Sequence, residues 1–119
     1  MRCFLRLFPV TGLAVLGLAL AGFSDPAPMT AEEPVFVISI KDHVFEPVEL
    51  ELPAGERVKL VFKNLDPTPE EFESDDIGFE KIVLGGTQTS LYVGPLEPGT
   101  YNFFGEFHLD TAQGRLIVK

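Results

Sequence analysis

The stretch Val58-Lys-Leu-Val-Phe-Lys-Asn64 decides the fold class of this chain. Apolar residues at every second position from Val58 to Phe62 alternate with two lysines and a valine. Because successive side chains of a strand point to opposite faces, this period of two predicts a strand with one buried face. The tight turn Pro53-Ala-Gly-Glu56 precedes the strand, and the loop Asn64-Leu-Asp-Pro-Thr-Pro69 follows it, because two prolines interrupt any backbone ladder.

The rest of the chain after residue 34 repeats this pattern of short segments rich in β-branched and aromatic residues. The expected strands are 35–40, 45–52, 58–64, 70–74, 79–84, 87–93, 100–105 and 114–119, of which 70–74 is expected at a sheet edge. Eight short strands separated by turns that contain Gly or Pro, without a convincing helix, are typical of an all-β sandwich or barrel.

An N-terminal segment precedes the strands and has the pattern of a cleaved secretory signal. Arg2 and Arg6 form a short basic region, residues 13–20 are apolar and uncharged, and Ala19-Leu-Ala21 places small residues at the cleavage position. The apolar run is shorter than the ~20 residues of a spanning helix, so a retained membrane anchor is the less favoured alternative. We therefore expect a signal peptide over 1–21, a flexible leader over 22–33 and one domain over 34–119, periplasmic or secreted and without stable membrane insertion after cleavage.

The charge and the cysteine content exclude several classes of function. The chain carries 18 acidic and 9 basic residues, and its net charge is −9. Nucleic-acid phosphates require clustered Lys and Arg, so we expect no nucleic-acid partner. The single cysteine, Cys3, lies in the predicted signal, so the mature chain would have no cysteine nucleophile. Phosphate-binding and nucleophile-elbow motifs are absent from the sequence, and a small sandwich leaves little cleft, so we do not expect an enzyme.

The alternating direction of the strands places several loops at the same end of the sandwich. If consecutive strands run up and down, the loops around 41–44, 64–69, 85–86 and 106–113 share one end. These loops are expected to bring together His43, Asp66, Glu70, Glu106, His108 and Asp110. Both histidines of the chain belong to this set, although 65 residues separate them.

Several of these segments together resemble a cupredoxin domain. Phe45-Glu-Pro47, the turn at 53–56 and the strand at 58–64 with Asp66 resemble the first half of such a domain. Residues 95–104, Pro-Leu-Glu-Pro-Gly-Thr-Tyr-Asn-Phe-Phe, followed by His108 and Gly114, resemble the second half. The resemblance covers residues 35–119 and implies an eight-stranded Greek-key sandwich with a metal site at the end that the alternation of strands selects.

The same resemblance also implies where this chain departs from the family. A type 1 copper site uses two His, one Cys and usually a weak axial Met. On the alignment of motifs, Glu70 stands at the first His and Gly105 at the Cys, whereas His108 matches the second His. Residues 111–113, at the Met position, contain no Met. We therefore expect a protein that lacks the type 1 ligands and does not carry out blue-copper electron transfer.

Carboxylates surround the positions of the lost ligands. Carboxylate and imidazole suit Cu(II), Fe(III), Mn(II) or Zn(II), so we expect a divalent or trivalent metal ion, with Cu(II) or iron favoured. Glu70 and Glu73 would face opposite sides of a strand, so the acidic residues cannot all share one ion. The candidate ligands are Glu70, Glu106 and His108, with His43, Glu73 and Asp110 in second rank.

Two segments give the resemblance a finer implication. Glu70-Glu-Phe-Glu-Ser74 and Phe103-Phe-Gly-Glu-Phe-His108 resemble a carboxylate-rich cupredoxin-like subgroup associated with bacterial iron-uptake permeases. This implies a role in metal uptake, with an inner-membrane iron permease or a periplasmic metal-uptake protein as partner. The alternative is a metal-free sandwich that docks a basic partner through its acidic loops. A metal site needs a neutral imidazole among the carboxylates, whereas a docking surface does not.

Overall fold

The computed structural model describes Gly22 and residues 32–119. The predicted signal peptide over 1–21 lies outside the described residues, and of the predicted leader only Gly22, Glu32 and Glu33 are described. Within the described part of the chain, no helix has the length and hydrophobicity that crossing a membrane requires. Residues 32–119 belong to one compact unit.

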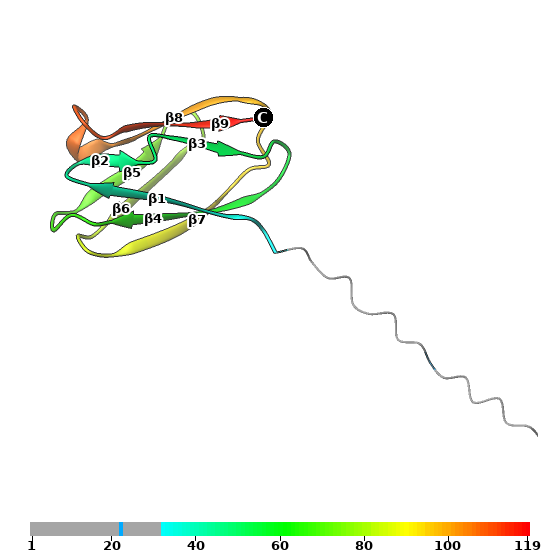
Figure 1. Ribbon diagram of the computed structural model, residues 1–119, viewed down its shortest axis with the longest axis horizontal. Helices are drawn as coiled ribbons and strands as arrows, with labels where there is room; N and C mark the ends of the chain where they lie inside the picture. The colour runs from blue at the N-terminus through cyan, green and yellow to red at the C-terminus, as the bar shows by residue number, and fades with distance from the viewer. Residues whose placement is uncertain (1–21, 23–31) are drawn as a thin grey trace, which may run out of the picture. The chain divides into compact units, whose positions relative to one another are not determined.

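Nine strands and one short 3₁₀ helix make up residues 35–119 (Figure 1). The elements are β1 (Val35–Lys41), β2 (Val44–Glu46), β3 (Glu49–Leu52), β4 (Val58–Asn64), β5 (Glu70–Ser74), β6 (Phe79–Val83), β7 (Gln88–Val93), β8 (Gly99–Gly105), η1 (Glu106–His108) and β9 (Gln113–Val118). They form a four-stranded sheet in the order β2-β1-β4-β7 and a five-stranded sheet in the order β3-β9-β8-β5-β6. The predicted all-β sandwich is therefore confirmed.

The strand expected over 45–52 is in fact two strands, which is why the structure has nine strands where the sequence predicts eight. β2 pairs with β1 in the four-stranded sheet, and β3 pairs with β9 in the five-stranded sheet. Pro47 separates them and has no N–H to donate to a ladder. The Val48 carbonyl already accepts the Arg115 N–H of β9 at 2.8 Å. The chain therefore crosses from one sheet to the other between β2 and β3.

The expectation that residues 70–74 form an edge strand is wrong. β5 lies between β8 and β6, and β6 is the edge strand. Glu70, Phe72 and Ser74 are all buried, so one face of β5 belongs to the core. The high acid content of this segment favours a solvated edge. The acid that faces the core is Glu70, and its carboxylate is surrounded by hydrogen-bond donors.

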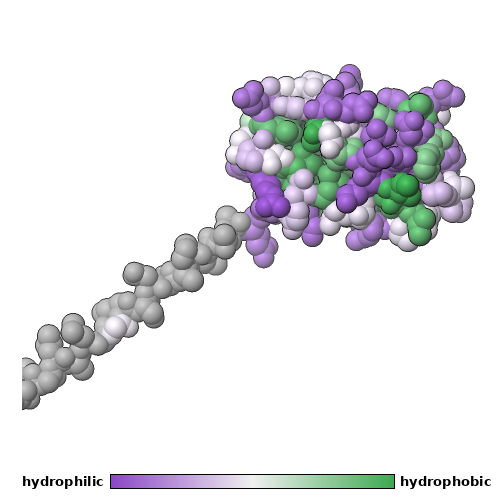
Figure 2. Space-filling view, turned by 180° about the vertical axis from the view of Figure 1, so that it is seen from behind, coloured by the Kyte–Doolittle hydropathy of each residue, from purple (hydrophilic) through white to green (hydrophobic). Residues whose placement is uncertain are grey.

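Four phenylalanines, two from each sheet, form the centre of the core. Phe45 and Phe62 come from the four-stranded sheet and Phe72 and Phe103 from the other, and each is at most 1% exposed. The Phe62 and Phe72 rings stack with centroids 4.3 Å apart, and Phe45 meets Phe103 edge-on at 4.9 Å. Gly114 is required beside this cluster, because a Cβ atom there would lie 2.2 Å from Cζ of Phe103. Outside the core, Figure 2 shows hydrophilic side chains over much of the surface around smaller apolar areas.

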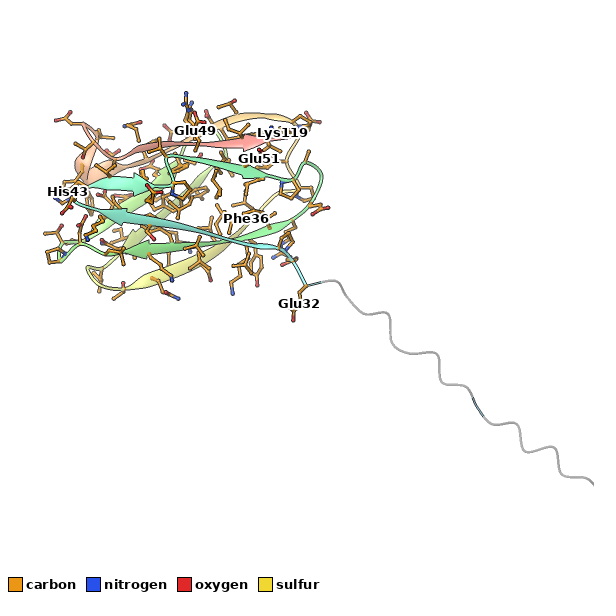
Figure 3. All side chains as sticks on the ribbon, in the orientation of Figure 1. Glu32, Phe36, His43, Glu49, Glu51 and Lys119 are labelled. Atoms are coloured by element: carbon orange, nitrogen blue, oxygen red, sulfur yellow. The ribbon has the colours of Figure 1, made fainter. Side chains whose placement is uncertain are left out.

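The two ends of the sandwich differ in what they carry. Figure 3 shows His43 at one end and Glu32 and Lys119 at the other. The segment around η1 lies at the His43 end (Figure 1). The connection between β6 and β7, which crosses from one sheet to the other, reaches the same loops, since the Gly86 N–H donates to the carbonyl oxygens of Asn64 and Asp66, both at 3.0 Å. The chain thus gathers the predicted loops at one end.

Candidate metal centre

Glu70 is the first residue of β5 and is only 2% exposed. Its Oε1 accepts the backbone N–H of Phe107 at 2.9 Å and that of Glu71 at 3.1 Å. Its Oε2 lies 2.5 Å from Nδ1 of His108. A buried carboxylate is costly unless it is hydrogen-bonded, and here every donor comes from the loop that carries His108 or from the next residue of β5. These contacts fix the carboxylate at the end of the sandwich.

His108 is the last residue of η1, and its side chain is 27% exposed. Its carbonyl oxygen accepts the N–H of Ala112 at 2.8 Å and that of Thr111 at 3.2 Å. The chain therefore turns back immediately after His108 and enters β9. The Glu70 carboxylate contacts the imidazole directly, and the hydrogen bonds of the loop at 108–112 fix the backbone that carries it.

Gly105, the last residue of β8, leaves room for the Glu70 carboxylate. A Cβ atom on Gly105 would lie 2.7 Å from Cδ of Glu70 and 2.7 Å from Cβ of Ala112. Real Cβ atoms do not approach so closely, so a side chain at this position and the present Glu70 conformer exclude each other. The space where the resemblance places a copper-binding cysteine side chain is filled by a carboxylate.

His43 reaches the same end from the turn between β1 and β2. Asp42 and His43 both have positive φ, 52° and 61°, a conformation that non-glycine residues adopt rarely. The Asp66 carboxylate accepts both backbone N–H groups of this turn, that of Asp42 at 2.7 Å on Oδ1 and that of His43 at 3.0 Å on Oδ2. One buried side chain from another loop thus adds two hydrogen bonds to a turn that the β1–β2 pairing closes.

The rings of His43 and His108 stack, with centroids 3.5 Å apart and an angle of 12° between their planes. His43, Glu70 and His108 each offer one ligand atom, and these atoms lie within 4.8 Å of one another. A pocket of ≈ 490 Å³ opens beside them, lined by His43 and residues 106–111. Both imidazoles thus line a solvent-accessible pocket, and the Glu70 carboxylate lies behind them, buried.

These three residues fit a metal ion. Nδ1 of His43 is buried and has no hydrogen-bond partner, because Asp66 Oδ2, at 3.4 Å, is near enough for an ion pair but is not placed for a hydrogen bond. An unsatisfied buried nitrogen costs about 1–3 kcal/mol. Two imidazoles and a carboxylate form the donor set of several zinc, copper and iron sites. Ligand atoms bound at about 2.0–2.2 Å lie roughly 3–4 Å from one another, so the three donors are close enough to share an ion once the His43 ring turns out of its stack on His108.

The structure separates the other predicted ligands from this group. Glu106 and Asp110 are exposed on the loop that carries His108. Glu73 lies on the outer face of β5, opposite to Glu70, as the alternation of a strand requires. Of the residues in the predicted set, Glu70, His108 and His43 are brought together, whereas Glu106, Asp110 and Glu73 are not part of the group.

The acidic residues on the outer face of β5 form a cluster of their own with β6. A side-chain hydrogen bond with Glu80 raises the pKa of Glu71 above its ordinary value of 4.5, and desolvation and nearby like charges act in the same direction. Desolvation, followed by the charge of Glu106, raises the pKa of Glu73. These carboxylates repel one another next to the candidate centre without taking part in it.

Sequence reasoning placed Asp66 at this end but gave it no role. Its contact with the His43 turn joins two loops that are 23 residues apart in sequence, and no local pattern specifies that pairing. The available signal was the pair Asp42-His43 after a β-branched strand, since Asp and His are among the residues enriched at positive φ.

Comparisons with known proteins agree with this architecture. The chain matches the family model of the cupredoxin-like domain over residues 12–118. It is 48% identical over 82 residues to the uncharacterized protein RP394 of Rickettsia prowazekii. The aligned residues make up 69% of this chain and 66% of that protein, so the chain spans just under two thirds of the relative's length.

Solved structures with low sequence identity share the fold. Reduced auracyanin from the photosynthetic bacterium Roseiflexus castenholzii superposes with a TM-score of 0.65 at 15% identity, over 73% of this chain and 98% of that one. The metal binding domain of the Cu(I) exporting P-type ATPase CopA of Streptococcus pneumoniae, with Cu(I), gives 0.64 at 16% identity, over 71% and 84%. With most of its length matched by the family model, this chain belongs to the cupredoxin-like domain family.

Proposed function

We propose that this protein binds one divalent or trivalent metal ion through Glu70, His108 and His43. The observation that carries the proposal is the contact between Glu70 Oε2 and His108 Nδ1 at 2.5 Å, with a ring nitrogen of His43 in the same group. A carboxylate kept at 2% exposure beside an imidazole is a preformed pair of donors. The pocket that His43 and His108 line gives an ion a path from solvent to the two rings.

Cu(II) or iron is the proposed ion. Carboxylate and imidazole are hard or borderline donors, which favour these ions over Cu(I). No residue from 32 to 119 is a cysteine, so the strong copper–thiolate bond of a type 1 site has no donor there and blue-copper electron transfer is not proposed. The CopA domain with this fold is described with Cu(I), which supports copper as the first element to test, and the carboxylate and imidazole donors of this chain favour its Cu(II) state. When bound, copper or iron supplies a positive charge and a one-electron redox couple.

The residues of the chain have separate tasks in this proposal. Glu70 receives two backbone N–H groups on Oε1, which leaves Oε2 directed at His108. His108 and His43 offer neutral ring nitrogens, and a proton on either ring competes with the metal. No residue of the group is placed as a nucleophile, and we propose a binding protein and not an enzyme.

The proposed setting is metal uptake outside the inner membrane. The signal-like segment at residues 1–21 supports a periplasmic or secreted protein. The resemblance of 70–74 and 103–108 to the carboxylate-rich subgroup supports delivery to an iron permease or a periplasmic uptake protein. A net charge of −9 would concentrate cations near the surface.

Calorimetric titration with Cu(II), Fe(III), Zn(II) and Mn(II) tests the proposal. The wild-type protein should bind one ion, and Glu70→Ala or His108→Ala should lower the affinity at least about tenfold. Asp110→Ala is the matched control, because this acid is exposed on the same loop but lies outside the group. Weak binding at several sites that neither substitution changes would contradict the proposal, and would favour an acidic docking surface for a basic partner.

A further inference from the structure

We propose that Asp66 is a positioning residue that holds the His43 ring in the metal centre. Asp66 is 6% exposed and comes from the loop between β4 and β5, whereas His43 comes from the turn between β1 and β2. The inference rests on the proposed function in one respect, since His43 is one of the proposed ligands. It concerns a residue that contributes no ligand atom to the group.

The first step of the argument is the conformation of the His43 turn. Two consecutive non-glycine residues, Asp42 and His43, are in the left-handed region. The two-residue hairpin between β1 and β2 favours this conformation, but each non-glycine residue adopts it at a steric cost, which further contacts can offset. The contacts come from the two carboxylate oxygens of Asp66, each of which accepts one backbone N–H of the turn.

The second step is that Asp66 is itself held rigidly. Its backbone N–H donates to Oδ1 of Asn64 at 3.0 Å, and Nδ2 of Asn64 donates to the carbonyl oxygens of Thr68 and Val83 at 2.8 Å and 3.0 Å. Its carbonyl oxygen accepts the Gly86 N–H at 3.0 Å. Hydrogen bonds to β4, to β6 and to the connection between β6 and β7 therefore hold the loop that carries the carboxylate.

The third step connects this framework to the ring. With the backbone of His43 fixed, its imidazole stacks on His108 at 3.5 Å, and its Nδ1 lies 3.4 Å from Asp66 Oδ2. Without the carboxylate, two backbone N–H groups lose their acceptor, and only the pairing of Lys41 with Val44 across the β1–β2 hairpin still favours positive φ at both residues. The ring of His43 would then leave the stack, and the centre would retain only Glu70 and His108.

Two measurements on Asp66→Ala and Asp66→Asn test the inference. In the metal-free protein, nuclear Overhauser contacts between the His43 and His108 ring protons should be present in the wild type, absent in Asp66→Ala and reduced in Asp66→Asn. The asparagine variant keeps one carbonyl oxygen as acceptor and serves if the alanine variant does not fold. Retention of the ring contacts in a folded Asp66→Ala variant, or unchanged ring contacts in Asp66→Asn, would overturn the inference.

The second measurement is a double-mutant cycle with Cu(II) as the ligand. Asp66→Ala and His43→Ala should each lower copper affinity about tenfold or more, and the double variant should be no weaker than either alone. Additive losses would mean that Asp66 does not act through His43. A wild-type protein that binds no copper would instead refute the proposed function, and the ring contacts of the metal-free protein would still decide the role of Asp66.

Discussion

Glu70 Oε2 and His108 Nδ1 lie 2.5 Å apart, although the two residues are 38 positions apart in sequence. Glu70 begins β5 and His108 ends η1. They can meet because Gly105, the last residue of β8, has no side chain. The Phe107 N–H then completes the contacts of the carboxylate at 2.9 Å. The glycine at the end of β8 thus makes room for the buried Glu70 carboxylate, which faces the His108 imidazole.

Gly105→Ala should therefore damage the centre. The new Cβ atom would lie 2.7 Å from Cδ of Glu70, so the carboxylate must leave its position and metal affinity should fall at least about tenfold. Overpacking should also lower the free energy of unfolding by about 1–3 kcal/mol. Gly99→Ala, at the other end of β8, is the matched control, because its nearest neighbour would be 3.7 Å away. Calorimetry and chemical denaturation measure both effects; equal behaviour of the two variants would contradict the account.

Metal affinity should depend on pH with a defined sign. The ligand form of imidazole is neutral, so protons compete with the ion and affinity should decrease as the pH falls below about 6. Titrations with Zn(II) between about pH 5 and 8 measure this without a change of oxidation state. His108→Ala should flatten the profile. An affinity that stays constant over the range would show that no histidine binds the ion.

Asn64→Ala should destabilise the whole domain. Asn64 is 1% exposed, and its side chain makes three hydrogen bonds, to the Asp66 N–H and to the carbonyl oxygens of Thr68 and Val83. Their loss leaves buried polar groups without partners and should lower the free energy of unfolding by about 1–3 kcal/mol. Asn102→Ala on the exposed face of β8 is the control and should change it by less than about 0.5 kcal/mol. Urea denaturation of both variants checks the difference.

The acidic cluster on β5 and β6 should limit stability at neutral pH. The pKa of Glu71 is raised by its hydrogen bond with Glu80, so the folded protein binds this proton more tightly than the unfolded chain does. That contribution is complete at acid pH and is lost as the pH rises through the raised pKa. Glu80→Gln should therefore raise the melting temperature at pH 7, and the gain should shrink as the pH falls toward 4.5. Glu97→Gln, in the turn before β8, should show no such trend in thermal unfolding.

The sequence predicted the sandwich because its strands alternate clearly, as in the segment from Val58 to Asn64. It did not predict the crossing at Pro47, although the alternation breaks there: Phe45, the buried residue of β2, is out of phase with Leu50 and Leu52 of β3. It placed β5 at an edge because acids usually face water. The burial of Glu70 depends on donors from Phe107 and His108, which lie far along the chain.

The end of the sandwich was predictable from strand direction, but the membership of the site was not. Glu106 lies two residues from His108, which in a strand would place both on one side. The chain forms a 3₁₀ helix there, with three residues per turn, so the two side chains point in different directions. The stacking of His43 on His108 depends on the hydrogen bonds that the Asp66 carboxylate accepts from the turn that carries His43. Only the folded structure shows that contact.

An anomalous-scattering map of crystals grown with copper tests the central claim most directly. The account predicts one site, with the ion about 2.0–2.2 Å from donor atoms of Glu70 and His108 and with His43 as the third ligand. The ring of His43 should turn out of its stack on His108, because ring nitrogens bind metals in the plane of the ring. Copper at the carboxylates of Glu71, Glu73 and Glu80 alone, or no ordered copper at all, would contradict the account.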